Sequence, residues 1–347
     1  MRICAVMCVR NEAAFLLDWL AHHQACGITD FVVMSNDCDD GTDTVLDRLQ
    51  AMGIVHHIRN DGPYGKQGIQ FAGLKRADDH PAVQNADWLL ALDIDEYVNV
   101  HVGDRTLPAL TRALPDATAI TLTWRLFGNA GLRDYTDTPL RETFTRAAPA
   151  IINWPWRATM FKTLYRNDAN YARLGVHRPR AFDKSRAPRW FDGEGRLLGP
   201  EFTDKRIFSN YGQSNTALAQ LNHYPLGSMQ GYILKSARGR AVHSDDSLGM
   251  DYWCERNYAC ATDNTITALP CDTQRAALAA DPQLAALHAA AVAWRHAEFD
   301  RLMLHDGPRA LYARLLMTPP SRSLTSDEAL LLRRYAQTAQ NQMTHTP

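Results

Sequence analysis

The chain has 347 residues, of which 46% are hydrophobic and 22% charged, and this is the composition of an ordinary soluble globular protein. Its length suits one large α/β domain or two smaller ones. The formal net charge of −1 excludes a global electrostatic attraction to nucleic acid or to an anionic membrane surface.

Cysteine usage and hydropathy bear on the compartment. The seven cysteines are Cys4, Cys8, Cys26, Cys38, Cys254, Cys260 and Cys271. An odd count with scattered spacing fits reduced thiols better than a disulfide framework, so we expect a cytoplasmic protein. No run approaches the roughly 18–20 apolar residues of a membrane span, and the apolar start is too short for a signal peptide. We therefore expect no transmembrane segment, and the sequence leaves peripheral membrane contact open.

Residues 1–100 alternate between predicted strands and helices. Apolar runs at 2–9, 29–35, 54–58 and 88–92 predict buried strands. The segments between the first three runs repeat apolar residues at three- and four-residue spacing, which is typical of helices. This βαβαβ order predicts a parallel sheet with right-handed crossovers, so the expected fold class is α/β with a Rossmann-like nucleotide-binding sheet.

The strand predicted at 88–92 ends in three carboxylates, Asp93, Asp95 and Glu96. Side chains alternate along an extended chain, so we expect Asp93 and Asp95 to point the same way and Glu96 to turn inward. Two neighbouring like charges are stabilised by a cation between them, and Mg²⁺ or Mn²⁺ prefers carboxylate oxygens. The sequence predicts a metal–diphosphate site here, with a solvated acidic turn as the alternative.

Polar residues also follow the first two predicted strands. Asn11 and Glu12 come after the first, and Asn36 and Asp37 come after the second. In parallel sheets ligands bind outside the carboxyl ends of the strands, so these side chains should converge with the acidic turn on one crevice. Their amide and carboxylate groups suit a nucleotide base or ribose, although helix capping is an alternative role for the first pair.

Residues 101–240 carry candidates for acceptor binding. Trp124 ends a predicted strand and Trp156 lies in an aromatic cluster, and aromatic rings beside polar groups suit stacking on sugars but are as common in a core. His177 lies downstream of that cluster and is a third candidate. From residue 274 on, helix formers dominate. We expect a domain at 1–240, with a nucleotide-binding half at 1–100 and an acceptor half at 101–240, and a helical extension at 241–347.

Five motifs, in order between residues 3 and 240, resemble GT-A glycosyltransferases of the family 2-like and family 92-like kind. They are Asn11-Glu12 with Trp19-Leu20-Ala21-His22-His23, Asn36-Asp37 through Asp40-Gly41-Thr42, Asp93-Ile94-Asp95-Glu96-Tyr97, Trp124 through Gly131, and Asn222-His223-Tyr224 with Ser228 and Lys235 through Gly239. The C-terminal helices are not covered. Asn36-Asp37-Cys38 stands where the pattern has Asp-Asn-Ser, so which of Asn36 and Asp37 meets the base stays open.

The resemblance implies a GT-A type mixed sheet flanked by helices. It also implies a nucleotide-sugar donor, most often a UDP-sugar, and a glycan, lipid-linked or other hydroxyl acceptor. A divalent metal, Mn²⁺ or Mg²⁺, would neutralise the departing diphosphate. The implied metal ligands are Asp95 and His223, with Asp93 beside the metal or the ribose. A buried core histidine is the alternative for His223.

Four further side chains are candidates to bind the nucleotide. Lys66 and Gln67 lie in the glycine-rich loop at 61–68, within reach of a diphosphate or base. Lys235 and Arg238 would share one helix face and bind pyrophosphate, although a solvated helix face is the alternative.

An inverting enzyme needs one general base to deprotonate the acceptor hydroxyl. Glu142, Asp134 and Asp137 qualify by position after the acidic turn. Glu142 is preferred because Arg141 to Phe144 resembles the family's "ErF" element.

Other functions fit less well. A nucleotidyltransferase acting on a sugar phosphate usually has a glycine-rich basic stretch after its first strand, where this chain has Arg10 to Ala14. A phosphoaspartyl phosphatase normally has a small hydroxylated residue two positions after the second Asp, where this chain has Tyr97. A non-catalytic nucleotide-sugar-binding protein is disfavoured because Asp93, Asp95 and His223 are intact.

Overall fold

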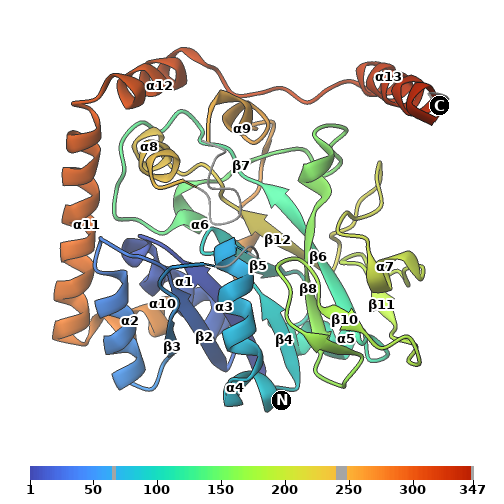
Figure 1. The fold of residues 1–347 in the computed structure, drawn as a ribbon, viewed down its shortest axis with the longest axis horizontal. Coiled ribbons are helices and arrows are strands. Elements are labelled where there is room, and N and C mark those ends of the chain that lie inside the picture. Colours follow the sequence, from blue (N-terminus) through green and yellow to red (C-terminus); the bar gives the residue numbers. More distant parts are fainter. Residues whose placement is uncertain (65–67, 240–247, 345–347) are drawn as a thin grey trace.

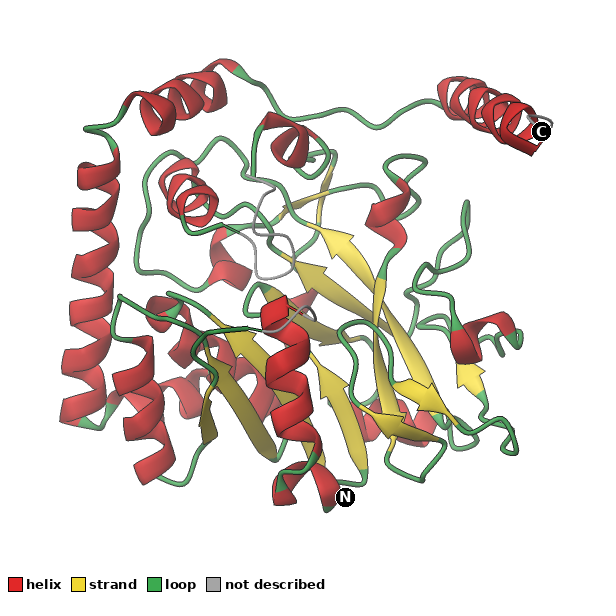
Figure 2. Ribbon diagram, viewed as in Figure 1, coloured by secondary structure: helices red, strands yellow, loops and turns green. Residues whose placement is uncertain are grey.

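The computed structural model describes residues 1–64, 68–239 and 248–344, and one mixed sheet forms its centre (Figure 1). Within these residues the sheet has nine strands, in the order β3-β2-β1-β4-β8-β6-β12-β5, with β11 beside β6. Helices cover both faces (Figure 2). The strands are β1 Ile3–Val9, β2 Asp30–Ser35, β3 His56–Arg59, β4 Trp88–Ala91, β5 Glu96–Val100, β6 Ala119–Leu126, β8 Phe161–Arg166, β11 Trp190–Phe191 and β12 Ala219–His223.

Short elements and helices complete the described chain. Two small ladders join β9 Tyr171–Arg173 to β10 Arg180–Phe182, and β7 Arg146–Ala147 to β13 Ala261–Thr262. The helices are α1 Ala13–Ala25, α2 Thr42–Ala51, α3 Gly68–Asp78, α4 Pro81–Gln84, α5 Leu107–Ala113, α6 Leu140–Thr143, α7 Glu201–Asp204, α8 Met229–Ala237, α9 Met250–Cys254, α10 Asp272–Ala279, α11 Pro282–Leu302, α12 Asp306–Met317 and α13 Ser326–Thr344, with 3₁₀ turns at Trp156–Thr159 and Thr265–Ala268.

The N-terminal part of the sheet is parallel, as predicted. Strand β1 pairs in parallel with β2 and with β4, and β2 pairs in parallel with β3. The apolar runs supply this core, because α1 and α2 pack on one face while α3 and α4 pack on the other. The carboxyl ends of β1, β2 and β4 therefore lie at one edge of the sheet.

The rest of the sheet mixes strand directions. Strand β8 is antiparallel to both β4 and β6, whereas β12 is parallel to β6 and antiparallel to β5. A mixed sheet covered by helices confirms the expected fold class, which is an α/β fold with a mixed sheet flanked by helices.

Residues 92–95 leave the sheet after β4 and form a turn, so the expected strand alternation at Asp93 and Asp95 was wrong. The chain then enters β5, which pairs with β12 at the far edge, where Glu96 is opposite His223. The backbone N–H of Tyr224 donates to the carbonyl of Asp95 at 2.8 Å. Glu96 is fully buried and points inward, as expected. The topology thus brings His223 beside the acidic turn.

Helix α1 fastens the start of β5 through buried polar side chains. The indole of Trp19 donates to the carbonyl of Glu96 at 3.0 Å, and His22 Nε2 donates to the carbonyl of Val98 at 2.8 Å. His23 Nδ1 donates to the carbonyl of Trp19 at 2.8 Å, and its Nε2 accepts the N–H of Val98 at 3.3 Å. The Trp-Leu-Ala-His-His motif is therefore a support for the acidic turn, and its histidines are neutral.

The C-terminal helices pack on the sheet domain. Helices α10 and α11 lie against α1, and α11 also contacts α2 and α8 (Figure 1). Arg48 Nε donates to Asp281 at 3.0 Å across the α2–α11 contact. A Cβ on Gly128 would lie 2.2 Å from the carbonyl oxygen of Tyr258, so this close approach requires a glycine. The region after residue 248 also holds the two-residue strand β13, which pairs with β7.

The described helices and cysteines bear on membrane crossing and on disulfide bonding. No single helix there is long and apolar enough to cross a membrane, although the bent pair α10 and α11, at 97°, meets the same length and composition criteria. All seven cysteines are free thiols in the structure.

Burial lowers the pKa of His22 to about 4, because its Nδ1 is buried with no partner among the described residues. The unfolded chain binds this proton near pH 6.5, so the free energy of unfolding should fall as the pH falls from about 6.5 to about 4. His22→Gln keeps an N–H donor for Val98 and should reduce this slope by up to about 1.4 kcal/mol per pH unit. Urea unfolding at several pH values measures it.

The same exchange at exposed His305 is the control and should keep the parent slope. An unchanged slope in His22→Gln would contradict this role of His22.

Candidate active site

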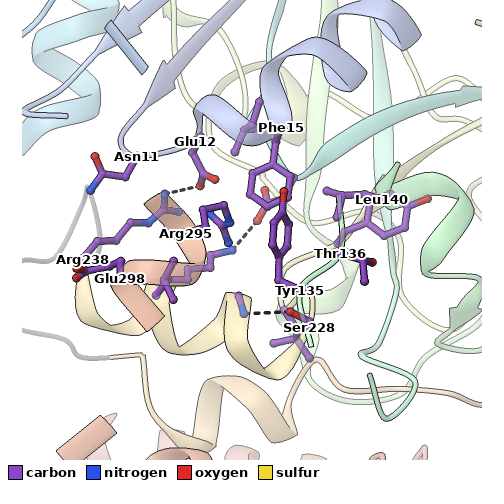
Figure 3. A pocket seen from close by; sticks show the side chains of 18 of the residues that line it. Asn11, Glu12, Phe15, Tyr135, Thr136, Leu140, Ser228, Arg238, Arg295 and Glu298 are labelled. Atoms are coloured by element: carbon purple, nitrogen blue, oxygen red, sulfur yellow. Dashed lines mark hydrogen bonds and ion pairs between the residues drawn. The ribbon is translucent and has the colours of Figure 1, made fainter. Parts of the chain in front are cut away.

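Two cavities open at the carboxyl ends of the parallel strands and share one wall. The strand-end cavity, about 530 Å³, is lined by residues that include Arg10, Asn36, Gln70, Asp93, Trp124 and His223. The helix cavity, about 440 Å³, is lined by residues of α1, α8, α11 and the 132–144 segment (Figure 3). The common wall consists of Arg10, Glu12, Ile94, Asp95, Lys235 and Arg238. Asp95 therefore borders both cavities.

Lys162 on β8 neutralises the first part of the acidic turn. Its Nζ lies 2.9 Å from Asp93 Oδ2 and 3.4 Å from Glu96 Oε2. The lysine side chain is 1% exposed, and Glu96 is fully buried. Burial alone would lower the pKa of Lys162, but the two carboxylates outweigh it and raise this pKa. A charged Lys162 thus holds both carboxylates of the turn.

Glu96 is a structural acceptor at the centre of this network. Its Oε2 accepts the backbone N–H of Asp93 at 2.8 Å, and its Oε1 accepts the indole N–H of Trp124 at 2.6 Å. Burial raises the pKa of Glu96 above its usual value, and the charge of Lys162 opposes this shift. Its contacts fix the turn and the Trp124 ring.

Asp95 is held from the opposite side. Lys235 Nζ on α8 donates to Asp95 Oδ2 at 2.6 Å, and His223 Nε2 lies 3.6 Å from Asp95 Oδ1. Burial by itself would raise the pKa of Asp95, but the neighbouring positive charges lower it well below the usual value. The His223 ring centre lies 4.3 Å from that of Trp124, with the two ring planes tilted by 46°. The Nδ1 atom of His223 has no partner among the described residues.

The donor set fits a metal only in part. No three His, Cys, Asp or Glu side chains of the described chain are grouped closely enough to hold an ion by themselves. Asp95 and His223 already face each other and offer a carboxylate oxygen and an imidazole nitrogen. Asp93 is instead engaged by Lys162 and, at 3.4 Å, by Gln70. A divalent ion here would be bound by two protein side chains, and substrate oxygens would complete its coordination.

Of the residues expected to bind the nucleotide at the ends of the first two strands, some line a cavity and all make hydrogen bonds within the protein. Asn36 is buried and bonds Val9 and Asn60, although it lines the strand-end cavity. Asn11 lines the helix cavity, and its side chain accepts the N–H of Asp39 at 2.7 Å. Asp37 is exposed and accepts the Tyr64 hydroxyl at 2.6 Å. This hydrogen bond lowers the pKa of Asp37.

Glu12 and Arg238 form an ion pair in the common wall (Figure 3). Arg238 also donates to the carbonyl of Arg10. The proposed pair Lys235 and Arg238 therefore does reach the site, but each is paired with an acidic residue there. Lys66 and Gln67 lie outside the described residues.

The three residues expected to bind the acceptor do not all lie together. Trp124 and His177 both line the strand-end cavity, and their rings meet edge to face at 5.7 Å. Burial lowers the pKa of His177 to about 4, so it is neutral near pH 7. Trp156 is 43% exposed and lines neither cavity.

The candidate general bases Asp134 and Glu142 also lie in different places. Asp134 lines the helix cavity and accepts a hydrogen bond from Gln230 Nε2 at 3.2 Å. Glu142 lines neither cavity and lies 2.9 Å from Arg141 Nη2 and 3.6 Å from Arg275 Nη1.

Sequence reasoning missed Lys162, Gln70 and the buried Arg295 of α11. A signal did exist for Lys162, since it is the single cation in the apolar run Phe161 to Tyr165. A lysine in such a strand is expected to need a carboxylate partner. Arg295 lies in an alanine-rich helical pattern, and nothing local indicates that it reaches the site.

Comparison with known proteins gives the family of this chain. The sequence model named Glycosyltransferase family 92 matches residues 2–194. Because this match covers more than half of the 347 residues, the chain belongs to glycosyltransferase family 92. This confirms the family 92-like part of the resemblance.

Curated relatives are similar over a short stretch. A glycosyltransferase family 92 protein of Oryza sativa subsp. japonica is 28% identical over 112 residues, which is 32% of this chain and 18% of the relative. One of Ricinus communis is 28% identical over 143 residues, 38% of this chain and 24% of the relative. The chain thus matches less than a quarter of the length of either plant protein.

Solved structures are more distant. S. aureus TarS 1–349 is 14% identical at a TM-score of 0.30, covering 48% of this chain and 47% of that one. Glucosyl-3-phosphoglycerate synthase from Mycobacterium tuberculosis, in complex with Mn²⁺, UDP and its product, is 18% identical at a TM-score of 0.25, covering 36% and 44%. Similarity at this level carries no argument about the site.

Lys162→Met tests the charge balance of the turn. It leaves Glu96 buried without its cation, so the free energy of unfolding should fall by about 3–5 kcal/mol. The double variant Lys162→Met/Glu96→Gln removes both charges and keeps an acceptor for Trp124, so it should recover part of the loss. Urea unfolding near pH 7 measures both. A single variant as stable as the parent would contradict this account.

Proposed function

We propose that this chain is a metal-dependent glycosyltransferase that moves a sugar from a UDP-sugar to the hydroxyl of a glycan or other acceptor, with inversion. The observation that carries the proposal is that Asp95 borders two cavities at the strand ends. Membership of glycosyltransferase family 92 supports the reaction class. The free thiols support a cytoplasmic location.

The strand-end cavity is the proposed donor site. It lies at the carboxyl ends of β1, β2 and β4, where nucleotides bind in open α/β sheets. Asn36 and Asp93 face the nucleoside there, and Trp124 and His177 offer a partly apolar surface for the sugar. The diphosphate would then lie at the common wall, beside Lys235 and Arg238.

Asp95 and His223 are the proposed metal ligands. A divalent ion bound there would neutralise charge on the departing diphosphate. In the structure Lys235 already supplies positive charge to Asp95. With a divalent ion on Asp95, the Lys235 ammonium would be free to bind the diphosphate oxygens. Asp93, fixed by Lys162, is assigned to the ribose.

The helix cavity is the proposed acceptor site, and Asp134 is the proposed base within it. The acceptor hydroxyl gives its proton to Asp134 as its oxygen bonds the anomeric carbon, and the broken glycosidic bond leaves its electrons on the diphosphate. Geometry favours Asp134 over Glu142, because Glu142 is paired with two arginines outside the cavity.

The test is a product assay with Mn²⁺, in which nucleotide-sugars and nucleoside triphosphates are offered in turn. The parent should release UDP from a UDP-sugar and release no pyrophosphate from a triphosphate. Asp134→Asn should lower kcat by about 10²–10⁴-fold with little change in the affinity for UDP.

Glu142→Gln removes a carboxylate of the same region and is the matched control, expected to stay within about threefold of the parent because it touches no substrate cavity. Pyrophosphate release would instead indicate a nucleotidyltransferase. Full turnover by Asp134→Asn would reject Asp134 as the base.

A further inference from the structure

Arg295 is a buried cation in the helix cavity that has no counter-ion among the residues that the structure describes. Its side chain comes from α11 and is 6% exposed. Within the described part of the chain it donates no hydrogen bond and has no carboxylate within ion-pair distance, and its Nε is buried without a partner. A guanidinium carries five N–H donors and is always charged, so this arrangement leaves its hydrogen-bonding capacity unused.

Two aromatic rings pack against the Arg295 guanidinium and orient it, but they provide neither a counter-charge nor a carboxylate acceptor for its N–H groups. Its Cζ lies 4.5 Å from the centre of the Phe15 ring and 4.7 Å from that of Tyr135 (Figure 3). Such contacts hold the plane of the guanidinium, but they return only a fraction of the cost of removing a charge from water. Burial accordingly lowers the pKa of Arg295. An anion bound in the cavity would supply the opposite charge and the hydrogen-bond acceptors that the rings do not.

The nearby carboxylates are already committed. Glu12 pairs with Arg238, and Asp95 pairs with Lys235. A third pair joins Glu298 to Arg301 at 2.6 Å. The remaining carboxylates of this cavity, Asp39 and Asp134, are exposed to solvent and not in ion-pair contact with Arg295. Among the described residues, Arg295 is thus a buried positive charge of this cavity that is left unpaired when these ion pairs are formed.

The cavity has room for a sugar-sized ligand. Its volume of about 440 Å³ lies in the range of small-molecule sites. Gly231 of α8 lies beside Arg295, where a Cβ would approach Nη2 at 3.5 Å, so the glycine leaves that side of the guanidinium uncrowded. Asp95 lies in the same cavity, so a ligand held by Arg295 would have its other end near the common wall.

We propose that Arg295 binds the anionic group of the acceptor, a carboxylate or a phosphate carried by a sugar. This rests on the proposed function, and it defines the acceptor as an acidic glycoside or a sugar phosphate. Arginine suits both groups because its planar fork donates two parallel hydrogen bonds to either one. Arg295 lies outside the matched residues 2–194, so this specificity comes from the C-terminal helices.

The test is calorimetric binding of three probes to the full chain, namely methyl β-D-glucuronide, glucose 6-phosphate and methyl β-D-glucoside. The parent should bind at least one anionic probe about tenfold or more tightly than the neutral one, and the stronger of the two identifies carboxylate or phosphate. Arg295→Met fills the space between the rings without a charge and should lose this preference. Arg295→Lys should keep part of it.

Arg309→Met is the control, because it removes a cation of α12 that is already paired with Asp306 and that lines neither cavity. It should retain the preference for the anionic probe. UDP binding in the presence of Mn²⁺ should be unchanged in Arg295→Met, which shows that this variant is folded.

Equal binding of anionic and neutral probes by the parent would overturn the proposal, and so would an Arg295→Met variant that keeps the preference. Failure of the proposed function is separate, because it would appear as an absence of UDP binding and turnover in the parent. The binding measurements with the three probes report on Arg295 in the absence of any nucleotide-sugar donor.

Discussion

The structure depends on the neutralisation of an acidic turn by two lysines from different elements. Lys162 on β8 holds Asp93 and Glu96, and Lys235 on α8 holds Asp95. Unpaired charges of this burial would cost several kcal/mol each, so the turn is stable only when β8 and α8 are docked. The packing of β8 and α8 against the turn therefore stabilises the sheet and the site together.

The topology explains why distant residues meet at this turn. Because β5 pairs with β12 instead of continuing beside β4, His223 is placed opposite Glu96 and next to Asp95. Helix α1 fastens the start of β5 with Trp19 and two neutral histidines. Helices α8 and α11 then close the second cavity, so the C-terminal region completes the site that the first half of the sheet begins.

Much of the fold and part of the candidate site could be predicted from the sequence. The features that could not be predicted have physical causes. The parallel strands and the turn were predictable because their apolar periodicity is local. The bend after Ala91 was not, since the pairing of β5 with β12 is a long-range choice that leaves no local pattern. Lys162 and Arg295 were missed because their roles depend on what packs against them.

The central claim is that Asp95 and His223 form a metal site that is complete only with a diphosphate. The most direct measurement is the affinity for Mn²⁺, by calorimetry or electron paramagnetic resonance, with and without UDP. The account predicts that UDP strengthens Mn²⁺ binding by about tenfold or more in the parent, and by linkage that Mn²⁺ strengthens UDP binding equally. Asp95→Asn should abolish this coupling, while Asp137→Asn, at a residue paired with His288 outside both cavities, should keep it. Coupling that persists in Asp95→Asn, or is absent from the parent, would contradict the account.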